Sequence, residues 1–519
     1  MTGTVKMLVP LKFPLAGEKL IEASAGTGKT YTIMILYLRL LLHHGVKAET
    51  DNSNTQSKLP KQLTAFHSPL NVKQILVVTF TEAATSELRG RIRTKIAQAK
   101  LAFSTGSSKD KEIAQLLNET EPAVYQRYVL QLEANERLMD EASIFTIHGF
   151  CQRMLKQNAF ESGAFFNIEL VESREHSQVL AVRDNWRKHI NSLPNELFNT
   201  VLKLWKSPEV LLDSLQICLD KKDIEIRSSY LPAGLELLNA QYKTKLQQFK
   251  TDWLSAINKC DIVSLLQQIR FKKSSKYSKQ DVSGLVNTVT DWAENNADNT
   301  IPDELQYFTL SKLLSSKLAS ADEPRHAIFT QCEAFLTDDL VSHYEKTIKD
   351  TLYIDALSFV RKSVFADKIN RQELSFNDLL NDMDDALEHE QGEHLAQRIR
   401  EQYPVAMIDE FQDTDSVQYR IFSRIYKDQP ATGWYMIGDP KQAIYAFRGA
   451  DIFTYINARR IISEHYSLIT NWRSSSAMIQ AVNQIFEFST PDNDFAPFIY
   501  NKDIPFHKVS PPLKENGQI

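Results

Sequence analysis

The sequence predicts an α/β fold with a parallel sheet and a phosphate-binding loop that follows one of its strands. A long helical segment is inserted between the two halves of this α/β domain. Three observations lead to this prediction. Residues 21–30 form a loop rich in small side chains, between a short apolar strand and the apolar helical run 31–42. Continuous apolar segments at 74–80 and 405–408 are typical of strands buried on both faces of a parallel sheet. Residues 164–402 carry apolar side chains three and four positions apart, the pattern of amphipathic helices.

Length and composition limit the class of protein. The chain has 519 residues, 43% of them hydrophobic, enough for roughly three domains with their own cores. The formal net charge of −5 excludes a basic surface all round, so a nucleic-acid partner would have to bind in a local groove. The 4 cysteines are widely separated, which excludes a disulfide framework. Because there is also no long apolar run, we expect a cytoplasmic protein without a signal peptide or a membrane span.

The phosphate-binding loop is the clearest candidate site. In such a loop, backbone N–H groups converge at a helix N-terminus, where the helix dipole also favours phosphate. Lys29 can reach the β- and γ-phosphates of a nucleotide, and the Thr30 hydroxyl can ligate Mg²⁺. The alternative is a chance Gly-Lys-Thr sequence before an amphipathic helix, which its position after an apolar strand disfavours. The expected nucleotide contacts are Ala23, Ser24, Ala25, Gly26, Thr27, Gly28, Lys29 and Thr30.

Two carboxylates follow the apolar strand at 405–408. Asp409 can hold Mg²⁺ directly or through water, and Glu410 can polarise the attacking water. An Asp-Glu pair is usually surface charge, but its position after a buried strand and downstream of a phosphate-binding loop favours the catalytic interpretation.

Two later segments add further groups to the same candidate site. Gln442 follows the strand at 434–439 closely enough to sense a γ-phosphate. Arg473 could act as an arginine finger, and the neighbouring Trp472 could stack on adenine. The sequence therefore predicts a site for hydrolysis of a nucleoside triphosphate.

A second set of residues suits single-stranded nucleic acid, because aromatic faces stack on bases and cations attract the backbone. Two members have simpler alternatives: Phe80 taken alone is more often a core residue, and His148 is equally well explained as a helix cap. The basic segment 270–279 could bind a duplex backbone or be a solvated loop. The expected single-strand contacts are Thr79, Phe80, Thr81, His148, Tyr445, Phe447 and Arg448.

The ordered set of motifs resembles the superfamily-one helicases of the UvrD/Rep group. Within that group, Phe13-Pro14-Leu15 and the loop after it resemble the start of the RecB branch. The resemblance covers the motif-bearing parts across the chain and is loose in the helical segment. The matching elements are the phosphate-binding loop, Thr79-Phe80-Thr81, Thr146-Ile147-His148-Gly149-Phe150, Asp409-Glu410-Phe411-Gln412-Asp413, residues 438–451 and Asn471-Trp472-Arg473-Ser474.

The resemblance implies a RecA-like P-loop NTPase motor domain that uses ATP and Mg²⁺. Members of the group translocate 3′ to 5′ on single-stranded DNA, and the RecB branch works with RecC-like and RecD-like subunits on duplex ends in recombinational repair, with an exonuclease domain. The resemblance assigns MgATP binding to Lys29 and Thr30, metal and water to Asp409 and Glu410, γ-phosphate sensing to Gln442 and Arg473, adenine packing to Trp472, and the single-strand track to Phe80, His148, Tyr445, Phe447 and Arg448.

The resemblance also predicts the domain organisation. We expect residues 1–163 and 403–466 to form the two halves of the first motor domain, 164–402 a helical arm insertion, and 467–519 the start of a second motor domain. The glutamine motif that many relatives use to read adenine, the later helicase motifs and the nuclease domain are not evident. We therefore expect a fragment or truncated form that binds ATP, binds single-stranded DNA weakly and unwinds little. The alternatives are an AddA-type subunit, a solitary UvrD-like helicase, and a non-catalytic nucleotide-dependent binding module.

Overall fold

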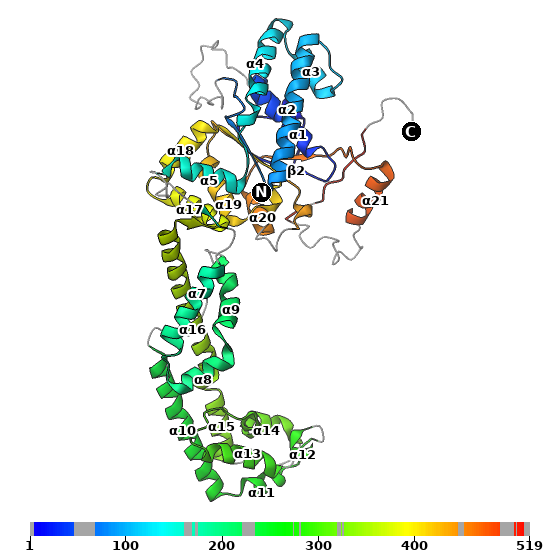
Figure 1. The fold of residues 1–519 in the computed structure, drawn as a ribbon. Coiled ribbons are helices and arrows are strands. Elements are labelled where there is room, and N and C mark those ends of the chain that lie inside the picture. The colour runs from blue at the N-terminus through cyan, green and yellow to red at the C-terminus, as the bar shows by residue number, and fades with distance from the viewer. Residues whose placement is uncertain are drawn as a thin grey trace, which may run out of the picture. The chain divides into compact units, whose positions relative to one another are not determined.

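The computed structural model describes residues 5–45, 68–159, 169–171, 175–220, 234–272, 275–279, 282–318, 323, 326–444, 451–487, 503–504 and 506–512. The chain divides into two compact units: Met1–Glu172 together with Gln372–Ile519, and Ser173–Arg371. The first unit contains the parallel sheet, and the second is built of helices (Figure 1).

The first unit alternates strands and helices along the chain. Its strands are β1 (Lys6–Met7), β2 (Gly17–Ala23), β3 (Ile75–Thr79), β4 (Ile144–Thr146), β5 (Glu169–Leu170), β6 (Glu373–Leu374), β7 (Val405–Ile408), β8 (Gly433–Gly438) and β9 (His465–Leu468). Its helices are α1 (Lys29–Leu42), α2 (Glu82–Thr105), α3 (Lys111–Glu119), α4 (Tyr125–Arg137), α5 (Ile147–Gln157), α17 (Phe376–Glu388), α18 (Gly392–Gln402), α19 (Ser416–Tyr426), α20 (Ile452–Ile461) and α21 (Ser476–Glu487).

The main sheet has seven strands in the described part of the chain, in the order β1-β9-β2-β8-β7-β3-β4, and all neighbours are parallel. The α/β parallel-sheet prediction is confirmed. β2 pairs with β8 from Gly17↔Gly433 to Glu22↔Gly438, and β8 pairs with β7. Because parallel strands end at the same edge, the segments that follow β2, β7 and β8 are neighbours.

Helices cover both faces of this sheet, because its strands bury alternate side chains on opposite sides. In β3, Ile75 and Val77 join the core formed with α1, α2, α3 and α4. Leu76 and Val78 face the other way, into the core formed with α5, α17, α18, α19 and α20. Figure 1 shows the two helical layers. The continuous apolar character of β3 follows from this burial on both faces.

The segment before β2 is fastened to α1 by one buried arginine. The Arg39 guanidinium donates to the backbone carbonyls of Pro10 and Phe13, both at 2.7 Å. The ring of Phe13 packs edge-on against Tyr435 of β8 and Tyr466 of β9. Burial lowers the pKa of Arg39 to about 10, so it stays charged at neutral pH. The Phe13-Pro14-Leu15 opening therefore has a structural role in holding α1 against the sheet.

The helical unit is shorter than the predicted arm. The prediction was 164–402, whereas the compact helical unit is Ser173–Arg371. α17 packs against α5 and α19, and α18 packs against α17 and α19, so both belong to the first unit. Amphipathic periodicity has the same form whether a helix packs on a sheet or on other helices, so the pattern did not mark this boundary.

The predicted boundary at residue 466 also differs from the structure. It would cut β9, which pairs with β1 and β2 inside the first sheet. The residue pattern of a strand that follows a helix does not indicate which sheet the strand joins. Residues 467–519 therefore begin within the first sheet, and their assignment to a second motor domain stays a prediction.

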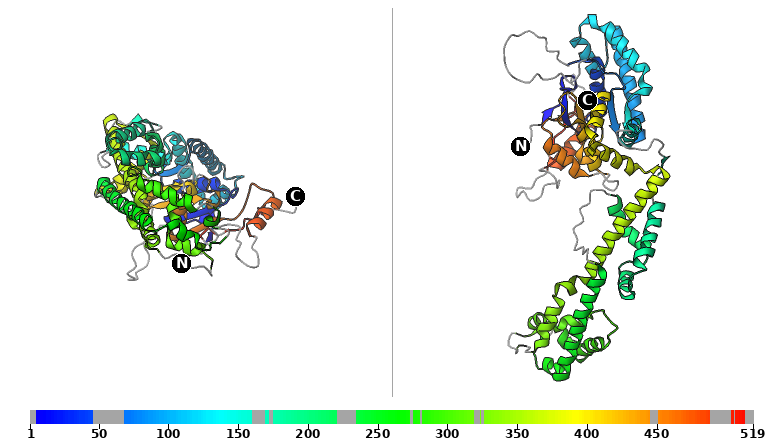
Figure 2. Two further views of the ribbon diagram at one scale, coloured as in Figure 1. Left: turned by 90° about the horizontal axis from the view of Figure 1, so that it is seen from below. Right: turned by 90° about the vertical axis from the view of Figure 1, so that its left-hand side faces the viewer.

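The long helix α16 (Asp339–Arg371) packs against α7, α9 and α10 in the helical unit (Figure 1), which Figure 2 shows from two further directions. Apart from α16, its helices are α7 (Glu175–Asn185), α8 (Asn195–Leu204), α9 (Pro208–Asp220), α10 (Leu235–Lys259), α11 (Ile262–Gln267), α12 (Lys276–Lys279), α13 (Val282–Glu294), α14 (Leu310–Ser316) and α15 (Ala327–Leu336). None of the helices described in either unit is long and apolar enough to cross a membrane.

Candidate functional site

The phosphate-binding loop lies between β2 and α1, as the sequence predicts. Gly26 and Gly28 have positive φ values of 80° and 89°, a conformation that glycine adopts without strain. Thr27 closes the turn, because its amide and its hydroxyl both donate to the Ser24 carbonyl, at 3.2 and 2.7 Å. α1 begins at Lys29 with Gly28 as its N-cap. The unpaired amides of this first turn provide the donors and the dipole that a phosphate group needs.

The segment after β9 packs directly on this loop. The Asn471 side chain donates to the Ala25 carbonyl at 3.1 Å, and the Trp472 amide donates to the Gly26 carbonyl at 2.8 Å. A Cβ added at Gly26 would lie 2.9 Å from the Cβ of Arg473, so a larger side chain there would collide with this segment. The structure thus brings Arg473 beside the phosphate-binding loop.

Trp472 lies next to the start of α1. Its ring reaches within 3.8 Å of the position that a Cβ would occupy on Gly28, and 65% of the side chain is exposed. An exposed aromatic ring beside a phosphate-binding loop can stack on a flat base. Stacking of Trp472 on adenine stays a prediction.

Lys29 and the two carboxylates after β7 form one charged cluster. The Lys29 ammonium pairs with Glu410 and lies 3.6 Å from an Asp409 oxygen. Burial raises the pKa of Asp409 to about 6. The positive charge of Lys29 lowers this pKa and the negative charge of Glu410 raises it, so the attraction of Lys29 offsets only part of the effect of burial. Asp409 and Thr30 supply the oxygen donors that Mg²⁺ prefers, so the residues present fit this cation. No group of three or more His, Cys, Asp or Glu side chains placed to hold a metal ion occurs among the described residues.

The backbone of Glu410, a predicted catalytic residue, is unusual, and its neighbour Gln412 was missed as a functional candidate. Glu410 has a positive φ of 55°, which is uncommon for a residue other than glycine and clusters at functional sites. Gln412 is 2% exposed, and it hydrogen-bonds to both Glu410 and the Asp439 amide. The sequence showed Gln412 within a motif, but its contact with Asp439 depends on how β7 and β8 pair.

Gln442 lies in the short 3-10 turn that follows β8. Its side-chain amide donates to Asp439 Oδ2 at 2.7 Å, and Lys441 pairs with the same carboxylate at 2.8 Å. β8 lies between β2 and β7, so this turn is at the sheet edge that also carries the phosphate-binding loop and Asp409. Four of the five residues predicted to be catalytic follow these three neighbouring strands, and Arg473 reaches the loop from β9.

The predicted nucleic-acid contacts in β3 already have local partners. The Thr79 hydroxyl is buried against Thr85 Oγ1 at 2.6 Å, and Thr81 caps α2 by accepting from the Ala84 amide at 3.1 Å. Phe80 is half-buried at the end of β3. β3 pairs with β7, and the Asp409 amide donates to the Val78 carbonyl at 2.9 Å, so these residues lie beside the strand that carries the two carboxylates. Tyr445, Phe447 and Arg448 fall outside the described residues.

His148 lies on the first turn of α5, next to the end of β4. Its ring is half-buried and meets Phe376 edge-on, with ring centroids 5.7 Å apart. Burial lowers the pKa of His148 below its ordinary value, so the imidazole is neutral at neutral pH. The cap of α5 is Thr146, which accepts from the Gly149 amide at 3.1 Å, so His148 is not the side chain that caps this helix.

The predicted duplex patch at 270–279 is tied into the helical unit where it is described. Phe271 stacks on Tyr277 with ring centroids 4.4 Å apart, and the buried Tyr277 donates to the Tyr307 carbonyl at 2.5 Å. The two aromatic rings therefore belong to the interior of this unit. The prediction of duplex binding therefore depends on the basic residues of this segment and not on its aromatic rings.

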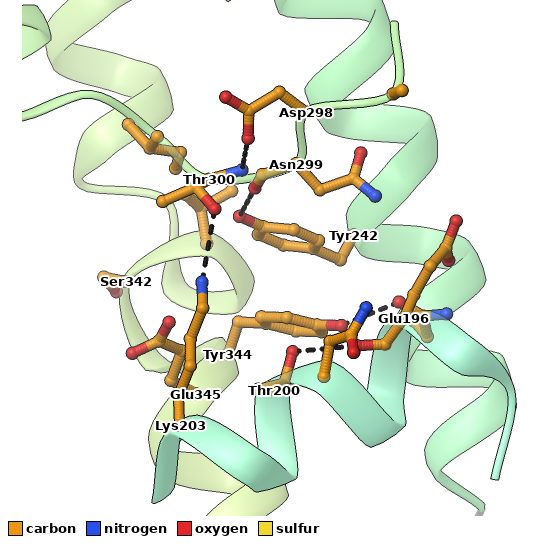
Figure 3. A pocket seen from close by; sticks show the side chains of 15 residues that line it. Glu196, Thr200, Lys203, Tyr242, Asp298, Asn299, Thr300, Ser342, Tyr344 and Glu345 are labelled. Carbon is orange, nitrogen blue, oxygen red and sulfur yellow. Dashed lines mark hydrogen bonds between the residues drawn. The ribbon is translucent and has the colours of Figure 1, made fainter.

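A polar cavity of about 670 Å³ also lies in the helical unit, between α8, α10 and α16 (Figure 3). Tyr242 and Tyr344 stack in its wall at 3.7 Å, with both hydroxyls hydrogen-bonded to asparagines. Three carboxylates line it, those of Glu196, Asp298 and Glu345, against the ammonium of Lys203. This charge balance disfavours phosphate, so we do not assign nucleotide or nucleic acid to this cavity.

The fold and the site together define a P-loop nucleotide hydrolase. Its parallel sheet presents a phosphate-binding loop, a lysine and two carboxylates on neighbouring strands, and an arginine segment packs on the loop. The family model described as "UvrD/REP helicase N-terminal domain" matches residues 9–462, and the chain belongs to this family. Membership of a helicase family implies that the chain uses ATP.

Sequence comparison identifies relatives over nearly the whole chain. The RecBCD enzyme subunit RecB of Escherichia coli (strain K12) is 41% identical over 513 residues, which is 98% of this chain and 40% of that protein. The RecBCD enzyme subunit RecB of Haemophilus influenzae is 38% identical over 531 residues, 95% of this chain and 41% of that protein. That of Chlamydia pneumoniae is 26% identical over 537 residues. The chain thus spans about two fifths of the length of the first two relatives, and the predicted resemblance to the RecB branch is confirmed.

Proposed function

We propose that this chain is the ATP-hydrolysing and single-strand-DNA-binding part of a RecB-type helicase subunit. The observation that carries the proposal is the packing of the Asn471-Trp472-Arg473 segment on the phosphate-binding loop, beside the cluster of Lys29, Asp409 and Glu410. The relatives from Escherichia coli and Haemophilus influenzae are RecBCD enzyme subunits. We also propose that the protein acts on duplex DNA ends in recombinational repair and translocates 3′ to 5′. Its proposed partners are RecC-like and RecD-like subunits.

The proposed hydrolysis assigns one task to each group. Lys29 and the loop amides bind the β- and γ-phosphates, and Thr30 and Asp409 provide oxygen ligands for Mg²⁺. When bound, Mg²⁺ would neutralise charge on the phosphate oxygens. Glu410 accepts the proton of the attacking water, and Arg473 stabilises the charge on the transferring phosphoryl group. Trp472 stacks on adenine, which orients the nucleotide.

The pairing of Lys29 with Glu410 is compatible with this assignment. One ammonium group cannot hold a carboxylate and a triphosphate equally well, so nucleotide binding would draw Lys29 toward the phosphates. Glu410 would then be released from its ion pair and become the acceptor for a water proton. The pair therefore keeps both groups at the site before nucleotide enters.

The direct test measures phosphate release by this chain with and without single-stranded DNA. We expect hydrolysis that DNA stimulates, and we expect Lys29→Met to lower it at least about 100-fold by removing phosphate binding. Lys73→Met is the matched control, because Lys73 precedes β3 at the opposite edge of the sheet and pairs with Glu141. Nucleotide binding without turnover would instead favour a non-catalytic binding module. Wild-type rates in Lys29→Met would refute the assignment of the site.

The single-strand track is tested separately. We propose that Phe80 and His148 contact single-stranded DNA together with Tyr445, Phe447 and Arg448. Removal of one stacking ring typically weakens binding by about 1–3 kcal/mol, so Phe80→Ala should raise the Kd for an oligonucleotide at least about 5-fold. An unchanged Kd, measured by fluorescence anisotropy at fixed salt, would remove Phe80 from the track. Phe365→Ala serves as the control for loss of an aromatic ring, because Phe365 is an exposed residue of α16 outside the predicted contacts.

A further inference from the structure

The buried side chain of Gln412 has both ends of its amide in use. Its Nε2 donates to Glu410 Oε2 at 2.8 Å and to Asp413 Oδ2 at 3.1 Å. Its Oε1 accepts from the Asp439 amide at 2.9 Å. The opposite orientation of the side-chain amide would set oxygen against carboxylates and NH₂ against N–H, so these partners fix its orientation. One side chain therefore joins the turn after β7 to the end of β8.

At one end of this link, Gln412 determines where the Glu410 carboxylate lies. The backbone of Glu410 is in the left-handed region with φ 55°, so contacts made by its neighbours must hold it there. Among the described residues, the partners of its carboxylate are Lys29 and Gln412. Because nucleotide phosphates compete for Lys29, Gln412 is the partner that can stay with Glu410 throughout the reaction.

At the other end, Gln412 reaches the turn that carries Gln442. β8 passes so close to Gln412 that a Cβ on Gly438 would lie 2.4 Å from its Oε1. The next residue, Asp439, is buried and accepts from the Gln442 side chain at 2.7 Å. A continuous path of hydrogen bonds thus runs from Glu410 through Gln412 and Asp439 to Gln442.

We propose that Gln412 is a positioning residue that holds Glu410 for activation of water and ties its placement to the turn bearing Gln442. The inference rests on the proposed ATP hydrolysis. A movement of Gln442 as the γ-phosphate leaves shifts Asp439, and the Gln412 amide passes this shift to Glu410. In the sequence, this turn is followed by the predicted DNA contacts Tyr445 and Phe447. Binding of nucleic acid to these residues would therefore change the position of Glu410 through the same hydrogen bonds.

Two substitutions separate positioning from simple filling of space. Gln412→Met keeps the length of the side chain and removes both ends of the link. Gln412→Glu keeps the shape and the acceptor for the Asp439 amide, but it replaces the donor by a carboxylate that faces Glu410 and Asp413. Gln418→Met is the matched control, because Gln418 is also buried in the first unit at 4% exposure and lies on α19.

The experiment measures kcat and KM for ATP, the Kd of a fluorescent ATP analogue, and the ratio of rates with and without single-stranded DNA. We expect Gln412→Met to lower kcat about 10- to 100-fold, to change the Kd less than about 3-fold, and to bring the DNA ratio toward one. Gln412→Glu should lose at least as much kcat although it is isosteric. Gln418→Met should keep both kcat and the ratio within about 2-fold of wild type.

The possible outcomes distinguish the two proposals. A wild-type chain without ATP hydrolysis would refute the proposed function, and the role of Gln412 with it. An active wild type with an unchanged kcat in both Gln412 variants would overturn this inference alone. Parallel losses of kcat, nucleotide binding and thermal stability in Gln412→Met, with a wild-type rate in Gln412→Glu, would reduce Gln412 to a packing residue.

Discussion

Glu22→Gln is expected to destabilise the first unit, because it removes a buried ion pair next to the phosphate-binding loop. Glu22 is in β2, one residue before Ala23, and its carboxylate accepts from Arg459 of α20 at 2.6 Å. Both side chains are 8% exposed, so the guanidinium would keep its desolvation cost after its partner was lost. The His507 ring lies 3.4 Å from the second carboxylate oxygen.

The size of the effect follows from the pKa of Glu22. Burial alone would raise this pKa, but His507 and Arg459 lower it from the ordinary 4.5 to about 2. The difference corresponds to about 3 kcal/mol of stability at neutral pH. Because the folded-state pKa is lowered, this contribution is complete above the unfolded pKa and is lost as pH falls from about 4.5 to about 2.

The assay is urea unfolding at pH 7 and pH 3.5, followed by tryptophan fluorescence, since Trp434 is buried in β8 of the same sheet. We expect Glu22→Gln to cost about 3 kcal/mol at pH 7 and about 1 kcal/mol less than that at pH 3.5. Glu87→Gln is the control, because the Glu87–Arg91 pair is exposed and should contribute less than about 1 kcal/mol. An equal cost of Glu22→Gln at both pH values would refute the reasoning.

Three further predictions concern the nucleotide site. Asn471→Ala removes the contact with the Ala25 carbonyl and should raise the Kd for ATP about 5-fold, measured by fluorescence titration, because a hydrogen bond of this kind contributes about 1 kcal/mol. Trp472→Ala should raise the same Kd about 5-fold and leave the melting temperature unchanged, because the side chain is exposed. Gly438→Ala should cost about 2 kcal/mol in urea unfolding, and the double variant with Gln412→Ala should recover part of that loss, since the added methyl meets Gln412. Equal losses with and without Gln412 would contradict the last prediction.

The phosphate-binding loop and the paired carboxylates could be predicted because their chemistry is local to the ends of apolar strands. Lys29 begins α1, and Asp409 follows β7, as the sequence indicated. Their direct contact required β2 and β7 to lie on either side of β8, an order that comes from long-range pairing and not from any single segment. Sequence reasoning thus found the groups, and the structure supplied their distances.

Residues whose role depends on a distant partner were harder to find. Gln412 is close in sequence to Glu410, but its second partner, Asp439, comes from the next strand of the sheet. Glu22 was seen only as part of the strand, because its charge is balanced by Arg459 far along the chain. The hydroxyls of Thr79 and Thr81 were predicted to contact DNA, and the structure gives each a local hydrogen bond; contact with DNA stays a prediction.

The strand order has a consequence for how the protein forms during synthesis. β2 and β3 leave the ribosome early, but they are separated in the sheet by β8 and β7, which follow the whole of Ser173–Arg371. At 5–20 residues per second, the intervening segment delays those strands by about 10 to 40 s. During that interval the early strands have exposed apolar faces and unpaired edges, a state prone to aggregation. Nascent chains of this protein should therefore depend on chaperones until β8 is complete, while the helical unit, with its more local contacts, folds first.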